Sequence, residues 1–291
     1  MATKRRPHIR HANYAHMTMF TDCLMYHVFY NAPDVVEHML RIILEIPLHV
    51  TKVHVERALK FNTGTGIRMD VHALDENGIH YNIEIQNNPK GASIERADYN
   101  GAAMKVFFSK RKKARRWIPK TFVIFITSDG HNCHGLPFYR YSLRGQSGEE
   151  TGIGTVIIFV NGLWRDSSDL GKMMHDFGCE DPKQMMDPVF ARRVAHVKSD
   201  KLVRRSMDQY EARKYRKAKR EGYKQGEANG IKIGEANGIK IGEANGEARG
   251  IKNTAIRMMR SGAFSDLQII EATGISKDEL VKIKLQDVSS S

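Results

Sequence analysis

The chain has little cysteine and no long apolar run. Its 291 residues include only Cys23, Cys133 and Cys179, which are too few and too scattered for a disulfide framework or a four-ligand zinc site. No stretch of about 18 apolar residues could span a bilayer. The basic residues that follow Met1 lead into no apolar segment of a secretion signal. We therefore expect a cytoplasmic protein in a reducing compartment, with no membrane partner.

Acidic residues are also fewer than basic ones. The chain has 46 Lys and Arg against 33 Asp and Glu, a net charge of +13. This excess favours a polyanionic partner, nucleic acid before an anionic membrane, although a solvated basic surface would give the same charge. The positive charge is concentrated in residues 110–116 and 192–220, which we predict to contact DNA phosphate. In the first run the predicted contacts are Lys110, Arg111, Lys112, Lys113, Arg115 and Arg116.

Residues 15–205 have the composition and order of elements of one α/β domain. Hydrophobic residues make up 41% of the chain and proline contributes only 8 residues, so most of the chain can form a core. We expect two helices within residues 17–46, the second starting near Pro33 with Asn31 as its cap. Strands are expected at 50–56, 67–73, 79–85, 121–127 and 155–160, with a helix at 93–110 and further helices over most of 168–220. The order predicts a mixed central β-sheet flanked by helices.

The C-terminal part has a different pattern. From Gly222 to Gly250 a glycine occurs at every fourth position, and each glycine inside a helix costs about 1 kcal/mol relative to alanine. Residues 206–250 therefore form either a flexible linker or, as we favour, a helical stalk that associates with a second copy or frays. Residues 251–291 are expected to form a small helical tail. Its turn at Gly274 is similar to that of a helix-turn-helix unit, with a helical cap or a dimerisation unit as the alternative.

A β-hairpin is the clearest local signal in the sequence. Apolar residues alternate with polar ones on both arms, at Ile67, Met69, Val71 and Ala73, then at Ile79, Tyr81, Ile83 and Ile85. Both apolar sets must share one sheet face, so paired residue numbers sum to an even value. A three-residue loop at 76–78, with Gly78 in the left-handed conformation, gives a sum of 154. This register places Asp70 opposite Glu84, with Gln86 one step further along.

Two adjacent carboxylates on one sheet face are destabilising unless a positive charge lies between them. A divalent cation would satisfy Asp70 and Glu84, because Mg²⁺ takes few protein carboxylates and keeps several waters. Alternatively, both side chains point to solvent and pair with Arg68, His72 or His80. The hairpin by itself leaves both readings open.

The spacing of these residues resembles the PD-(D/E)XK nuclease superfamily, most closely its recombination-promoting nuclease and putative transposase branch. The pattern is an acid on one strand, a turn, and an acid two residues before a polar side chain on the next strand. The resemblance covers most of the chain and is most specific over residues 67–99. It rests on Arg68–Val71, Gly78–Gln86, Glu95–Tyr99, the strand 121–127, Phe20–Asp22 with Val28–Phe29, and the glycine-spaced repeat.

This resemblance implies a restriction-endonuclease-like core and a Mg²⁺-dependent (or other divalent cation-dependent) DNA endonuclease linked to recombination or mobile elements. Asp70 and Glu84 would be the metal ligands, with the Ile85 carbonyl as a third. Gln86, where the superfamily has lysine, would be a catalytic residue that orients water without supplying a full positive charge. The implied supporting residues are Asp22, Arg96 and Tyr99.

One position departs from the family pattern, and two other functions stay open. The lysine expected three residues after Asp22 is Met25 here. The alternative from another functional class is a catalytically inactive, nuclease-like protein that binds or assembles on DNA. RNA cleavage is a third reading, since nothing in the sequence senses a 2′-hydroxyl group.

Overall fold

The computed structural model describes residues 14–61, 66–88, 91–112 and 115–288. These residues form two compact units, and the boundary falls between Lys214 and Tyr215. Within the described ranges, no helix is both long enough and apolar enough to cross a membrane. Each unit is described by itself.

Six of the described strands of the first unit form a mixed sheet, which confirms the α/β class. Its spatial order is β1 (Val50–Lys60), β2 (Gly66–Asp75), β3 (His80–Gln86), β6 (Thr121–Thr127), β8 (Thr155–Asn161) and β7 (Phe138–Tyr141). The pairs β1–β2, β2–β3 and β7–β8 are antiparallel, whereas β3–β6 and β6–β8 are parallel. Every residue of β6 is buried, as expected for a central strand covered on both faces.

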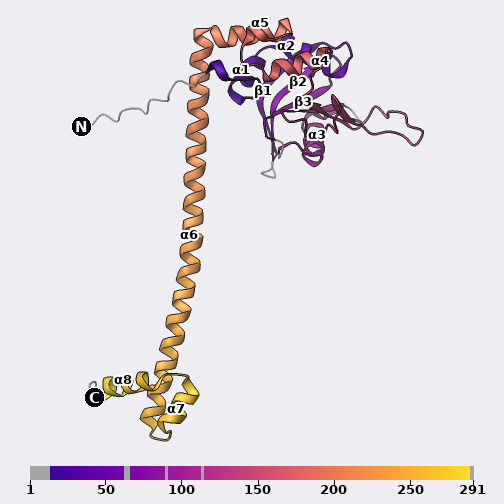
Figure 1. Ribbon diagram of the computed structural model, residues 1–291. Helices are drawn as coiled ribbons and strands as arrows, with labels where there is room; N and C mark the ends of the chain where they lie inside the picture. The colour runs from indigo at the N-terminus through magenta and orange to yellow at the C-terminus, as the bar shows by residue number, and fades with distance from the viewer. Residues whose placement is uncertain (1–13, 62–65, 89–90, 113–114, 289–291) are drawn as a thin grey trace. The chain divides into compact units, whose positions relative to one another are not determined.

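Helices cover both faces of this sheet (Figure 1). One face packs against α1 (Asp22–Phe29), α2 (Pro33–Leu44), α4 (Asp169–Gly178) and α5 (Pro188–Ser199), and it holds the larger hydrophobic cluster. The other face packs against α3 (Ile94–Phe108), which contributes Ala97, Ala103 and Met104 to a second cluster. The functional residues predicted from the sequence concentrate on the α3 face.

Several predicted boundaries need correction. Asn31 does not cap α2: it has a φ of 52°, and the capping position belongs to Ala32. The strand β1 continues to Lys60, four residues beyond its predicted end. Strand β7 and a separate two-stranded ribbon of β4 (Lys110–Lys112) and β5 (Arg115–Trp117) were not predicted. A short edge strand and a strongly basic ribbon lack the apolar alternation on which the predictions depended.

The predicted register of the hairpin is confirmed. Strands β2 and β3 pair from Val71↔Ile83 to Leu74↔His80, and each pair sums to 154. Gly78 has a φ of 78°, the left-handed conformation that the three-residue loop requires. The Asp75 carboxylate supports this loop by accepting the Ile79 N–H at 2.7 Å.

The prediction that one face of β2 carries all four apolar residues is wrong at one point. Val71 and Ala73 belong to the larger cluster, whereas Ile67 and Met69 belong to the cluster on the α3 face. On β1, Val55 pairs with Val71 and Arg57 pairs with Met69. Glu56, between these two β1 residues, has a φ of 52°. The register of β1 and β2 is the same on both sides of Glu56. Asp70 lies where β2 changes the core that it packs against.

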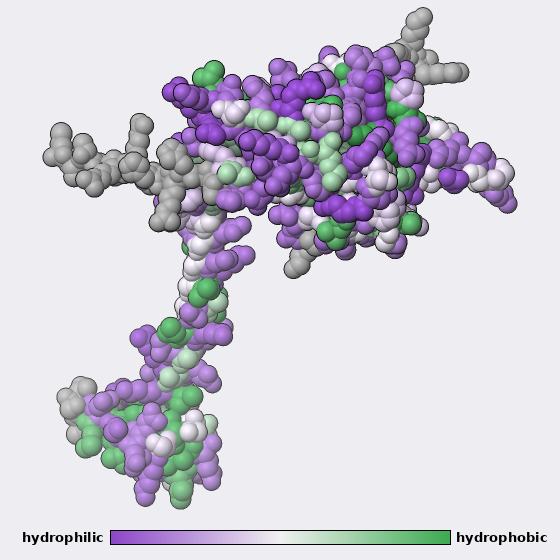
Figure 2. Space-filling view, turned by 45° about the horizontal axis from the view of Figure 1, so that its top comes forward, coloured by the Kyte–Doolittle hydropathy of each residue, from purple (hydrophilic) through white to green (hydrophobic). Residues whose placement is uncertain are grey.

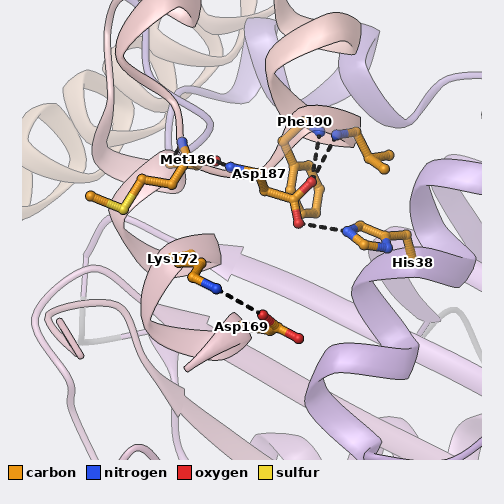
Figure 3. A network of polar contacts seen from close by, with 8 residues as sticks. His38, Asp169, Lys172, Met186, Asp187 and Phe190 are labelled. Carbon is orange, nitrogen blue, oxygen red and sulfur yellow. Dashed lines mark hydrogen bonds and ion pairs between the residues drawn. The ribbon is translucent and has the colours of Figure 1, made fainter. Parts of the chain in front are cut away.

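A polar network holds α5 against its neighbours (Figure 3). The Asp187 carboxylate caps α5 by accepting the backbone N–H groups of Val189 at 2.8 Å and Phe190 at 3.3 Å. It also accepts a hydrogen bond from His38 of α2 at 2.6 Å. The fully buried Asp176 of α4 in turn accepts the Asp187 N–H at 2.8 Å. Buried carboxylates thus join three helices, because each one is satisfied by several donors.

Two basic residues of the run 192–220, which we predicted to contact DNA phosphate, donate to backbone carbonyls inside the fold. Arg193 donates to three backbone carbonyls near the end of α1, those of His27, Val28 and Tyr30. Lys198 is 8% exposed, and its Nζ donates to three further carbonyls, those of Ala15, Met17 and Glu180. Other cations of this run, such as Arg205 and Arg213, are exposed.

The glycine repeat lies within α6 (Lys201–Ser261) and is helical throughout. At each repeat glycine, an added Cβ would meet nothing within 4 Å. The helix exposes Ile231, Ile233, Ile239 and Ile241 among mostly polar residues (Figure 2). Beyond it, α7 (Asp266–Thr273) and α8 (Lys277–Val288) complete the tail. The end of α6 joins them around a small core of Ala255, Ile269, Ile275, Leu280 and Ile283.

We predict that Lys198→Met lowers the free energy of unfolding of the first unit by about 1–3 kcal/mol, because three carbonyls lose their charged donor. Exposed Lys201 provides the control: Lys201→Met should change stability by less than about 0.5 kcal/mol. Urea titration followed by tryptophan fluorescence measures this, since Trp117 and Trp164 both lie in the first unit. Equal stability of the two variants would contradict a structural role for Lys198.

Candidate functional site

A polar cavity of about 550 Å³ lies against α1, β2, β3 and α3. Six residues predicted from the sequence line it: Asp22, Asp70, Ile85, Gln86, Arg96 and Tyr99. Glu84 is fully buried and joins the same group through Arg96. The structure thus brings together residues that are up to 77 positions apart, from Asp22 to Tyr99.

Asp70 lies just beyond the last recorded pair between β2 and β3, Val71↔Ile83. Its Oδ2 accepts the backbone N–H of Ile85 at 3.1 Å and the Gln86 Nε2 at 3.4 Å. A side-chain carboxylate therefore satisfies the backbone donor of β3 at this end of the strand pair. The contact fixes Asp70 beside the residues that follow Glu84.

Glu84 has no exposed surface. Its Oε2 accepts a hydrogen bond from Arg96 Nη2 at 2.7 Å and another from Gln86 Nε2 at 3.3 Å. Within the described residues, its buried Oε1 has no hydrogen-bond partner. The alternative in which this carboxylate points to solvent and pairs with Arg68, His72 or His80 is therefore wrong for Glu84.

Arg96 and Gln86 are positioned by a glycine that the sequence analysis missed. Arg96 Nη1 donates to the Gly91 carbonyl at 2.6 Å, and the guanidinium carbon lies 5.5 Å from the centre of the Phe125 ring. A Cβ at position 91 would lie 2.7 Å from Gln86 Oε1 and 3.0 Å from Arg96 Nη1. The absence of a side chain at Gly91 therefore leaves room for the side chains of Gln86 and Arg96.

The electrostatics of the site follow from burial. Burial raises the pKa of Glu84 well above its ordinary value, and the nearby negative charge of Asp70 raises it further. Burial also raises the pKa of Asp70, although the hydrogen bond from the Ile85 N–H opposes this. Arg96 forms an ion pair with Glu84, and the charges of Arg68 and Arg96 oppose the rise in the pKa of Asp70. A further cation would favour the charged form of both groups.

The donor set fits a divalent cation of the magnesium type. Among the described residues, no three His, Cys, Asp or Glu side chains are grouped to hold a metal, so the site does not resemble a structural zinc centre. Mg²⁺ needs only one or two carboxylates and keeps several waters. The buried Glu84 Oε1, which has no partner among the described residues, is the feature that a bound cation would satisfy.

Asp22 occupies the edge of this cavity and forms an ion pair with Lys214 of α6. The family pattern places a lysine at position 25, where this chain has Met25. Met25 is 3% exposed and belongs to the larger hydrophobic cluster, so a lysine there would be buried. The cation beside Asp22 comes instead from a residue 192 positions away.

The cavity also includes two residues that the sequence analysis did not assign to the site, Arg68 and Asn100. Asn100 lies four positions after Arg96 on α3, so helical periodicity could have identified it. The predicted DNA-binding run is different. Its backbone forms β4 and β5, residues 113–114 lie outside the described residues, and so do the side chains of 110–116.

Comparisons do not assign this site to a family. No protein-family model, curated protein or solved structure matches the chain. The chemistry of the site therefore rests on the residues themselves. The cavity of about 550 Å³ is lined by two carboxylates, two guanidinium groups and several side-chain amides, a set suited to binding a cation and an anionic substrate together.

We predict that the stability of the metal-free protein falls as pH rises from about 5 to 8, and falls less in Glu84→Gln. A raised folded-state pKa means that the folded protein binds more protons than the unfolded chain above about pH 4.3, so deprotonation favours unfolding. Each unit of pKa difference corresponds to about 1.4 kcal/mol.

Urea unfolding in EDTA at a series of pH values measures this effect. The matched control is Glu76→Gln, which changes an exposed acid in the same hairpin and should keep the wild-type pH slope. Identical slopes for Glu84→Gln and the wild type would show that Glu84 is not the group that responds to pH.

Proposed function

We propose that this chain is a Mg²⁺-dependent DNA endonuclease with a restriction-endonuclease-like core, acting in recombination or on mobile elements. One observation carries the proposal. Asp70 and Glu84, from neighbouring strands, both approach the Nε2 atom of Gln86 at the polar cavity, at 3.4 and 3.3 Å. The motif spacing of residues 67–99 and the net charge of +13 are consistent with this function.

Each residue of the site has a proposed role. Asp70 and Glu84 would hold the cation, with the Ile85 backbone next to them. When bound, the cation would withdraw charge from a phosphodiester oxygen and make water a better nucleophile. Gln86 would orient that water through its amide, which can donate and accept hydrogen bonds. Arg96 would provide positive charge toward the phosphate.

The position of Arg96 also supports a second candidate function. Its guanidinium already forms an ion pair with Glu84 at 2.7 Å, so one carboxylate of the site has a cation without any metal. A protein that has lost catalysis could keep this ion pair for stability alone. The alternative is therefore a nuclease-like protein that binds or assembles on DNA without cutting it.

Cleavage of supercoiled plasmid separates the two functions. We expect the purified chain to nick or cut the plasmid with Mg²⁺ and not with EDTA. Asp70→Asn and Glu84→Gln should each lower the rate by roughly a thousandfold, because a catalytic cation contributes several kcal/mol. Glu76→Gln is the control that changes an acid outside the cavity.

A parallel measurement shows whether the cation binds at all. Mg²⁺ should raise the melting temperature of the wild type, and this increase should disappear in Asp70→Asn. Stabilisation by Mg²⁺ without cleavage would exclude the nuclease function while keeping the metal site. Salt-sensitive DNA binding with neither cleavage nor stabilisation would favour the binding and assembly function.

We predict that Gly91→Ala lowers the cleavage rate about tenfold or more while changing stability by less than about 1 kcal/mol. The new methyl group would displace the flexible end of Gln86 or Arg96, not the backbone. Gly135→Ala is a poor control because Gly135 has a φ of 75°. Gly222→Ala is preferable, since Gly222 is helical with open space around it. Normal cleavage by Gly91→Ala would show that the precise position of Gln86 is unimportant.

A further inference from the structure

A second cavity, of about 410 Å³, lies at the other end of α3. It is bounded by the strands β1, β2 and β3, by the last residues of α3, and by Trp117 at the end of β5. None of the described residues that line it is acidic. This composition distinguishes it from the cavity of the candidate metal site, which Asp22 and Asp70 line.

Arg57 is a partly buried cation in this cavity without a carboxylate partner. Its guanidinium carbon lies 4.9 Å from the centre of the Phe108 ring, and Nη1 donates to His72 Nδ1 at 2.9 Å. No carboxylate of the described residues lies within ion-pair distance of it, and burial lowers the pKa of the guanidinium. A partly desolvated guanidinium without a counter-ion favours binding of an anion.

The neighbouring histidines are fixed in a neutral form. Arginine can only donate, so His72 Nδ1 must accept and the proton of His72 is on Nε2. This Nε2 then donates to His80 Nδ1 at 2.9 Å. Burial, followed by the charge of Arg57, lowers the pKa of His72 to about 2. The positive charge that faces the cavity therefore comes from Arg57 and Lys52, and the histidines serve as planar polar surfaces.

Aromatic rings also line this cavity. The Phe108 ring stacks on His80, with 4.0 Å between the ring centres and 10° between the planes, and also on His72 at 4.9 Å. Phe107 and Trp117 add two further rings. A cation beside several aromatic rings is the combination by which proteins bind a base and its phosphate together.

We propose that this second cavity binds a nucleoside phosphate, with the phosphate at Arg57 and Lys52 and the base against the rings of Trp117 and Phe107. The proposal goes beyond the nuclease function and does not require cleavage. Residues 110–116, six of which are Lys or Arg, connect Ser109 to Trp117, and both of these residues line the cavity.

The nucleotide could be free, or it could be part of a strand bound at the candidate metal site. His80 and Glu84 are four residues apart on β3 and share a sheet face, which corresponds to about 13 Å along the strand. One bound strand could span this distance. The two sources share the same chemistry, and separate probes distinguish them.

Trp117 provides the readout. In the full-length chain, Trp164→Phe leaves Trp117 as the only tryptophan, and Trp164 lines a different cavity. In EDTA, which prevents metal-dependent cleavage, we expect dAMP to change the Trp117 fluorescence. Deoxyribose 5-phosphate should bind at least about tenfold more weakly, because it lacks the stacking base.

Substitutions in the same background test the phosphate contacts. Arg57→Gln and Lys52→Gln should each weaken dAMP binding, the former by about tenfold or more, since a charge-assisted hydrogen bond is lost. Lys60→Gln removes an equal charge from an exposed position on the same strand and should have no effect. Because Lys52 is exposed, its variant tests the proposal even if Arg57→Gln does not fold.

The outcomes are distinct. Binding of dAMP but not of a short single-stranded oligonucleotide assigns the site to a free nucleotide. Oligonucleotide binding that depends on Arg57 assigns it to a strand. Equal affinity for dAMP and deoxyribose 5-phosphate would overturn the role of the rings. No dAMP binding, or equal binding by the Lys52, Arg57 and Lys60 variants, would overturn the site. None of these results depends on whether the chain cuts DNA.

Discussion

Glu84 is a carboxylate with no exposed surface beside a second carboxylate, and the side chains around it are arranged to satisfy that constraint. Arg96 extends from α3 to pair with it, Gln86 donates to both acids, and Gly91 leaves room for these two side chains. Removing water strengthens every one of these interactions. Burial destabilises the charged form of the Glu84 carboxylate. For the same reason, a bound cation would have a large effect on this group.

The face of the sheet beneath α3 combines two environments of opposite character. Near the start of the helix, Arg96 lies in a cavity with acids, and near its end, Phe108 lies in a cavity without any among the described residues. Both cavities are lined by residues of β2 and β3, the two strands of the hairpin. A polyanion bound across this face would meet the candidate metal site at one end and the cations Arg57 and Lys52 at the other.

The sequence predicted the parts of this arrangement that depend on local periodicity. The alternation of apolar residues and the position of Gly78 were sufficient for the hairpin register, and hence for the approach of Asp70 to Glu84. The change of face at Asp70 was not predictable, because the alternation of apolar residues continues unbroken from Ile67 to Ala73. The prediction of phosphate contacts covered the whole run that contains Arg193 and Lys198. Charge patterning does not reveal that these two cations donate to internal carbonyls.

The glycines of α6 have a mechanical consequence. Residues 222–250 contain eight glycines whose missing side chains would touch nothing else in the described chain, so each weakens the helix by about 1 kcal/mol without a packing gain. This stretch should therefore open under a smaller pulling force than helices with a buried face. Opening would lengthen it from about 1.5 Å to at most about 3.6 Å per residue. The segment is thus extensible, and its length depends on load.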